Sequence, residues 1–218
     1  MIRSTRESDK PVAYDHMIEN LEELLSELNP NDVSRFSLAG AETLWLTFKN
    51  TYAKEFKGDV NITSDLFDKA WLLVSGQLKD TTVDQLETAA KNQIPDLDNF
   101  MDIFESAWRT TLASAAQNAA TGVWLAICGL AVEPLGAAMD TSDIISNTLD
   151  ILISTQYSVE HGNDEYPSEE DVQGHPLYQH EKTRQLEAIK ALKNGKAANF
   201  RSEFVTLLNL ESLGLPPE

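Results

Sequence analysis

Apolar side chains recur every three or four residues along nearly the whole chain, which is the period of amphipathic helices. The first stripe covers residues 14–28 and ends at Asn29-Pro30, because a proline disfavours helical geometry at the residue before it. We therefore expect Asn31 or Asp32 to cap a second helix. That helix ends at Gly58 and carries a four-residue repeat: Phe36, Gly40, Leu44, Phe48, Tyr52 and Phe56.

Capping residues and prolines predict where the later helices begin. Ser64 is the expected cap of a third helix, and Thr82 with Gln85 has the capping-box pattern of a fourth, which ends before Pro95. We expect Asp96 or Asp98 to open a long fifth helix. The remaining helices are expected to begin at two prolines and at a final apolar stripe: Pro134, Pro176 and Phe200.

The same pattern predicts the fold class. No run of alternating apolar and polar residues with hairpin turns is present, so we expect an all-α fold. Short connections favour one bundle of about seven or eight helices over residues 14–213, preceded by a flexible tail at residues 1–13. The fifth helix is rich in alanine, and small side chains let helices approach closely, so we expect it at the centre of the bundle.

The uncharged run of residues 110–132 raises the question of a membrane span. Its strongly apolar part, residues 123–132, is only about half of the roughly twenty residues that a spanning helix needs. The N-terminal residues also lack an apolar stretch of signal-peptide length. We therefore expect this run to be a buried helix in a soluble, cytoplasmic protein that has no membrane partner.

Acidic residues outnumber basic ones by 35 to 17, which gives a formal net charge of −18. This balance argues against nucleic acid as a partner, because binding to phosphates requires basic side chains. The charge is concentrated, since residues 110–181 contain 11 acidic residues and no lysine or arginine. Its densest part, residues 160–174, is interrupted by Gly162, Pro167 and Gly174, which predicts an acidic loop. Such a loop either is merely solvated or attracts a basic partner.

Two acidic pairs at i, i+3 spacing suggest a metal-dependent alternative. Glu19 with Glu22 and Asp65 with Asp68 have the form in which all-α nucleotide pyrophosphohydrolases hold magnesium. Because acidic residues are frequent in this chain, such pairs also arise by chance. The first pair fits the solvated face of the first helix equally well.

The other candidates for chemistry fit structural roles better. His175 and His180 are five residues apart and Glu181 is adjacent to His180, so the three do not share one helix face as metal ligands do. Cys128, the single cysteine, lies in an apolar run without a nearby base, which is typical of an inert core thiol. Motifs of serine hydrolases and nucleotide-binding loops are absent. We therefore expect neither an enzyme nor a bound metal or cofactor.

Several segments resemble a known family. Residues 36–59 (FSLAGAETLWLTFKNTYAKEFKGD) and 66–78 (LFDKAWLLVSGQL) resemble the YjaG-like bacterial family of unknown function. Residues 92–100 (NQIPDLDNF) and 175–192 (HPLYQHEKTRQLEAIKAL) resemble its Ile-Pro lead-in and its late helix. This resemblance implies a compact all-helical fold without an established activity. The small-residue fifth helix is also similar to helical immunity proteins of bacterial toxin systems, which act by binding a cognate toxin.

Together these features predict an immunity protein that binds and neutralises a bacterial toxin with a basic surface. We expect the contacts to come from acidic side chains and from tyrosines, since aromatic residues dominate many interfaces: Asp164, Glu165, Glu169, Glu170, Asp171, Tyr157, Tyr166 and Tyr178. Two alternatives stay open. One is a YjaG-like cytoplasmic protein with a housekeeping role, which could form a homodimer, and the other is a magnesium-dependent nucleotide hydrolase.

Overall fold

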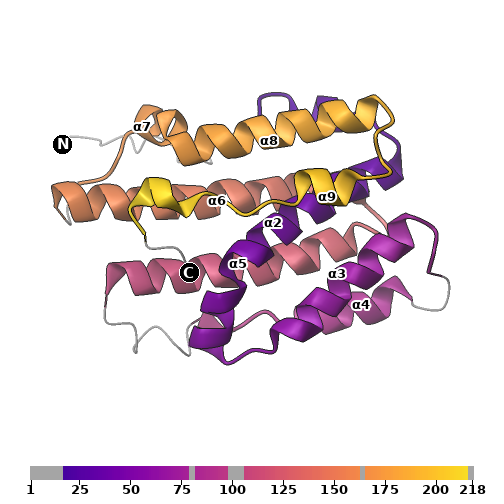
Figure 1. The fold of residues 1–218 in the computed structure, drawn as a ribbon, viewed down its shortest axis with the longest axis horizontal. Coiled ribbons are helices and arrows are strands. Elements are labelled where there is room, and N and C mark those ends of the chain that lie inside the picture. The colour runs from indigo at the N-terminus through magenta and orange to yellow at the C-terminus, as the bar shows by residue number, and fades with distance from the viewer. Residues whose placement is uncertain (1–16, 79–81, 98–105, 163–164, 216–218) are drawn as a thin grey trace, which may run out of the picture.

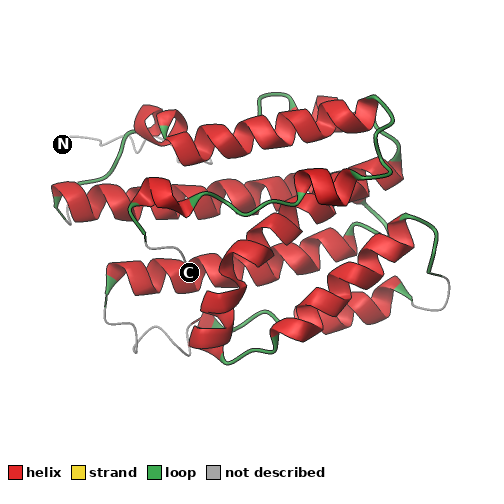
Figure 2. Cartoon of the chain, in the orientation of Figure 1, coloured by secondary structure: helices red, strands yellow, loops and turns green. Residues whose placement is uncertain are grey.

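A computed structural model of the chain describes residues 17–78, 82–97, 106–162 and 165–215. Over these ranges the chain is a bundle of helices without a strand, which confirms the predicted all-α class (Figures 1 and 2). In chain order the helices are α1 (Leu21–Ser26), α2 (Pro30–Phe56), α3 (Val60–Val74), α4 (Val83–Lys91), α5 (Ala107–Cys128), α6 (Pro134–His161), α7 (Glu169–Gly174), α8 (Pro176–Lys193), α9 (Phe200–Phe204) and the 3₁₀ helix η3 (Leu210–Leu213).

The helices α2, α5 and α6 pack against one another at the centre of the bundle (Figure 1). A Cβ atom added at Gly122 of α5 would lie 3.4 Å from Ile144 Cγ2 on α6 and 3.9 Å from Ala41 Cβ on α2. Small side chains on α5 therefore let both neighbours approach closely, and most of them are buried: Ala113, Ala115, Ala116, Ala119, Ala120 and Gly122. The prediction of an alanine-rich central helix is confirmed.

The remaining helices cover this centre from two sides. α3 and α4 pack on α2 and α5, whereas α8, α9 and η3 lie along α2 and α6 (Figure 1). Large side chains from both sides meet in the core, where Trp45, Phe48 and Phe67 are fully buried together with Phe200 of α9. Within the described ranges, none of the helices combines the length and the apolar content that crossing a membrane requires.

Helix α2 begins earlier than the sequence pattern predicts. Its cap is Asn29, whose side chain accepts a hydrogen bond from the backbone N–H of Asp32. Pro30 occupies the first helical position, where a missing N–H costs nothing because that group has no partner inside the helix. The prediction of Asn31 or Asp32 as the cap was therefore wrong by two or three positions.

The starts of α3 and α4 differ in how well they were predicted. Asp59 caps α3 by accepting from the backbone N–H of Asn61. The predicted cap, Ser64, lies inside this helix, and its hydroxyl donates to the carbonyl of Val60. Thr82 caps α4 as predicted, since its hydroxyl accepts from the backbone N–H of Gln85.

Other predicted boundaries lie at the edges of the described ranges. The first helix begins at Leu21, and the residues before 17, including the predicted tail at 1–13, lie outside the described ranges. Ser106 caps α5 by accepting from the backbone N–H of Arg109. Asp96 lies eleven positions before the first residue of α5, so it does not open this helix, and Asp98 lies outside the described residues. The predicted starts at Pro134 and Pro176 are confirmed.

The predicted acidic loop at residues 160–174 is only partly a loop, because two helices extend into it. α6 continues through Glu160 and ends at His161, and α7 occupies residues 169–174. Ser168 and Asp171 satisfy each other's backbone N–H groups in a capping box, which supplies the hydrogen bonds that a short helix needs at its start. The additional helix brings the number in the described residues to nine, above the seven or eight predicted.

The last helix is shorter than its apolar pattern predicted, because the chain is extended after Phe204. The backbone N–H groups of Thr206 and Leu208 donate to the hydroxyls of Thr43 and Thr47 on α2. These contacts tie the C-terminal segment to the long central helix.

Candidate protein-binding site

Helix α7 presents consecutive acidic side chains to solvent, since Glu169, Glu170 and Asp171 are all exposed, as is Glu165 before them. The Asp171 carboxylate accepts from the hydroxyl and the backbone N–H of Ser168 at 2.6 and 3.0 Å. These two hydrogen bonds lower the pKa of Asp171. Three carboxylates in the first turn also interact favourably with the helix dipole. The face is therefore negatively charged at neutral pH.

The three predicted tyrosines lie in different environments. Tyr166 is 75% exposed and lies next to the acidic side chains. Tyr157 is half-buried, and its ring stacks on that of His161 with the centroids 4.1 Å apart. Tyr178 is only 6% exposed and belongs to the hydrophobic core, so its ring is not on this surface. Asp164 lies outside the described residues.

A groove of about 520 Å³ lies beside this acidic face, between the N-terminal half of α5 and the C-terminal half of α6. Val159 and Tyr166, which are both exposed, form part of its lining. The Ser158 hydroxyl donates to the carbonyl of Glu165 at 2.9 Å and so links Glu165 to the C-terminal turn of α6. Six hydroxyl-bearing side chains complete the two walls: Thr110, Thr111, Ser114, Ser154, Thr155 and Ser158.

Two carboxyl groups along α6 have raised pKa values. Desolvation raises the pKa of Asp150, and a hydrogen bond from the Ser154 side chain partly opposes this rise. Desolvation together with the charge of Asp143 raises the pKa of Asp140.

His175 joins α7, α8 and the end of α6. Its Nδ1 accepts from the backbone N–H of Leu177, and its Nε2 lies 3.2 Å from Oε1 of Gln156. Gln156 in turn donates to the Glu160 carboxylate. Burial lowers the pKa of His175, although the charge of Glu160 acts in the opposite direction. A neutral ring with its proton on Nε2 satisfies both contacts, so His175 has a structural role here.

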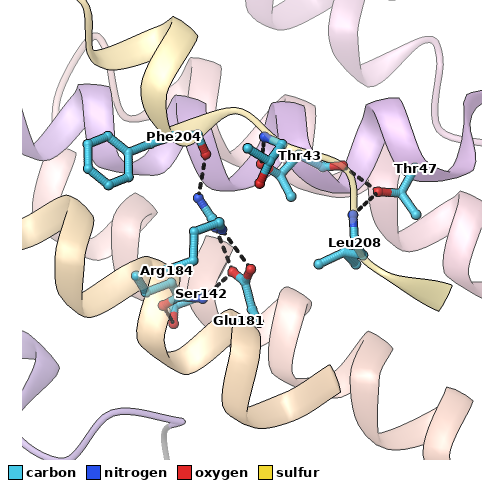
Figure 3. A network of polar contacts seen from close by, with 9 residues as sticks. Thr43, Thr47, Ser142, Glu181, Arg184, Phe204 and Leu208 are labelled. Carbon is cyan, nitrogen blue, oxygen red and sulfur yellow. Dashed lines mark hydrogen bonds and ion pairs between the residues drawn. The ribbon is translucent and has the colours of Figure 1, made fainter. Parts of the chain in front are cut away.

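Glu181 belongs to a buried polar network on α8 (Figure 3). Arg184 donates to both carboxylate oxygens of Glu181 at 2.6 Å, and Gln185 donates to one of them. Arg184 also donates to the carbonyl of Phe204, and Ser142 donates to Gln185. The network thus connects α8 to α6 and to the C-terminal segment, which gives this carboxylate a structural partner.

The residues of the magnesium alternative are engaged in other contacts or lie at the surface. Asp65 pairs with Lys69 on the same helix, and Asp68 pairs with Arg201 at 2.8 Å. Glu19 and Glu22 are exposed near α1. His180 is also exposed. Among the described residues, no three histidine, cysteine, aspartate or glutamate side chains are grouped so that they could hold a metal ion.

Cys128 lies at the end of α5 and is partly buried. Desolvation, with a smaller contribution from Glu87, raises the pKa of this thiol from 9.0 to about 11. Because the thiolate is the reactive form, this environment suppresses nucleophilic chemistry at neutral pH.

Comparisons with known proteins support the fold. No protein-family model matches the chain, and no curated protein matches it either. Among solved structures, the chain is similar to the crystal structure of a DUF416 family protein from Shewanella baltica, with a TM-score of 0.61 and 13% sequence identity. The match covers 86% of this chain and 94% of the other. At this low identity the similarity shows that the two chains share an all-helical fold.

Proposed function

We propose that this chain is an immunity protein, which neutralises a cognate bacterial toxin by binding to a basic surface on it. The observation that carries this proposal is that the carboxylates of Glu165, Glu169 and Glu170 are all exposed, as is the ring of Tyr166 in the same short stretch of chain. No basic residue in the long span around them offsets this charge.

Such a surface suits fast capture of a partner. Complementary charges steer two proteins together and raise the association rate, whereas a central aromatic side chain supplies contact energy after docking. Tyr166 supplies an aromatic side chain of this kind at the edge of the groove. In this proposal, the acidic side chains increase the association rate. The groove and Tyr166 then form the direct contacts of the docked complex.

The partner class follows from the same charges. A toxin that acts on nucleic acid or nucleotides often has a basic cleft that binds phosphates. The consecutive carboxylates of α7 could occupy such a cleft in place of phosphate groups. The alanine-rich sequence of α5, which resembles the central segment of helical immunity proteins, supports this proposal. Cytoplasmic location is part of the same proposal.

Co-expression with the product of the neighbouring reading frame tests this function. We expect the neighbouring product alone to stop growth, and we expect this chain to restore growth and to co-purify with that product. Restored growth without a stable complex would contradict neutralisation by binding. Failure both to bind and to protect would favour the alternative of a YjaG-like housekeeping protein.

A further inference from the structure

The hydroxyl groups that line the α5–α6 groove already donate hydrogen bonds within the protein. Thr110 donates to the carbonyl of Ser106, and Ser114 donates to the carbonyl of Thr110. On the α6 side, Ser158 donates to the carbonyl of Glu165 and Ser154 binds the Asp150 carboxylate. A hydroxyl has one hydrogen and two lone pairs, so each of these oxygens can still accept but not donate.

The hydrogen bond between Thr111 and Thr155 follows the same rule. Their hydroxyl oxygens lie 2.7 Å apart, and either could be the donor by distance alone. Thr155, however, donates its hydrogen to the carbonyl of Ile151 at 2.8 Å. Thr111 must therefore donate to Thr155. The hydroxyl groups along both walls of the groove can consequently only accept hydrogen bonds from a ligand.

Negative charge near the groove also favours a ligand that donates hydrogen bonds and carries positive charge. Asp150 and Glu165 are exposed next to groove residues, and the span 110–181 supplies no cation to them. Arg109, one position before this span, is paired with the buried carboxylate of Glu55 on α2 at 2.9 Å. The groove thus combines acceptor oxygens, nearby carboxylates and the exposed aromatic ring of Tyr166.

We infer that the α5–α6 groove binds an arginine side chain of a partner protein. A guanidinium carries five N–H donors in one plane and stacks on aromatic rings, so it matches both the acceptor oxygens and Tyr166. Lysine offers a compact charge without the planar surface. The hydroxyls of Ser154, Thr155 and Ser158 on α6 are the expected contacts. The end near Ala107 suits a cation less, because the N–H groups of the first turn of α5 point there.

This inference rests on the proposed function only in that a toxin would supply the arginine. Its test therefore uses the full chain and a synthetic probe, the peptide acetyl-Gly-Arg-Gly-Arg-Gly-amide. A second peptide with citrulline in place of arginine has the same shape but no charge. Titrations are followed by the backbone amide resonances of a ¹⁵N-labelled sample.

We expect the arginine peptide to shift the resonances of residues 154–158 and 166. We also expect it to bind about fivefold more tightly than the citrulline peptide, and Tyr166→Ala to weaken its binding about threefold, as a cation–π contact at an exposed site predicts. Leu207→Ala is the matched control, since Leu207 is 63% exposed on the C-terminal segment and should leave binding unchanged.

Equal binding of the two peptides would overturn the inference, as would shifts confined to residues 169–173. Tighter binding of the arginine peptide to a variant with Arg3→Ala and Arg6→Ala would also overturn the inference. In that case the chain's own N-terminal arginines would be competing with the peptide for the groove. Each of these results leaves the co-expression experiment unaffected. Conversely, a chain that binds the peptide in the groove but fails to protect against the toxin would contradict the proposed function alone.

Discussion

At the level of single residues, the buried ion pair of Glu181 and Arg184 has a structural role. Glu181 is completely buried and Arg184 is 8% exposed, and the two are joined by two hydrogen bonds. The sequence indicated neither fact, because a glutamate followed three residues later by an arginine is equally common on a solvated helix face. The pair is joined to distant parts of the chain, since Arg184 donates to the carbonyl of Phe204 and Gln185, which donates to Glu181, accepts from Ser142.

Removing the positive member of this pair should destabilise the protein strongly. Arg184→Met leaves the Glu181 carboxylate buried without its cation, so we expect the free energy of unfolding to fall by about 3–5 kcal/mol. Urea denaturation measures this change. Lys193→Met is the control, because Lys193 and Glu27 form a pair near the surface that should contribute about 1 kcal/mol or less. A similar loss in the two variants would contradict the structural role of the buried pair.

Cys128 should react slowly with alkylating reagents. A pKa of about 11 reduces the thiolate fraction at about pH 8 roughly a hundredfold relative to a pKa of 9.0. The higher intrinsic nucleophilicity of a more basic thiolate recovers about tenfold, which leaves a net reduction of about tenfold. Iodoacetamide labelling followed by mass spectrometry, with the urea-unfolded chain as reference, measures the ratio. Equal rates in the folded and unfolded chain would show that this environment does not protect the thiol.

At the scale of helices, the sequence predicted the number of long apolar stripes well and their boundaries less well. Asn29 and Asp59 cap their helices, although the pattern pointed to residues further on, because several polar residues in a row can each serve as a cap. The largest error concerns α7. Its glycine and proline neighbours indicated a loop, whereas Ser168 and Asp171 supply the reciprocal hydrogen bonds that stabilise a short helix.

The junction between α7 and α8 should be sensitive to pH. His175 caps α8 through an unprotonated Nδ1, and its pKa in the folded chain lies below the ordinary value of 6.5. The unfolded chain therefore binds this proton more readily. Its contribution to stability is complete above about pH 6.5 and is lost as the pH falls toward the lowered pKa.

Comparison with His175→Asn isolates this effect, since asparagine caps a helix without titrating. We expect the free energy of unfolding of the wild type to fall more than that of the variant between about pH 7.5 and about pH 5.5. Urea denaturation at the two values measures both falls. A wild type that loses no more stability than the variant would show that His175 does not couple folding to protonation.

At the scale of the whole molecule, many of the acidic residues lie in a stretch of sequence, residues 110–181, that contains no lysine or arginine. The uneven distribution is visible in the sequence, and the exposure of Glu165, Glu169 and Glu170 agrees with it. The groove beside them was not predictable from sequence. It exists because α5 and α6, whose facing residues are about forty positions apart, pack side by side. The burial of Tyr178 likewise depends on how α8 packs on the bundle.

The association rate of the complex tests whether the acidic face recruits a basic protein partner. Stopped-flow measurements at about 50 and about 200 mM NaCl compare two variants that each remove three negative charges. One carries Glu165→Gln, Glu169→Gln and Glu170→Gln on the acidic face. The other carries Glu19→Gln, Glu22→Gln and Glu23→Gln at α1.

We expect the variant of the acidic face to associate about tenfold more slowly at low salt and to lose most of its salt dependence. The α1 variant should behave like the wild type. If both variants retain the rate and the salt response of the wild type, or if both change equally, the acidic face does not recruit the partner.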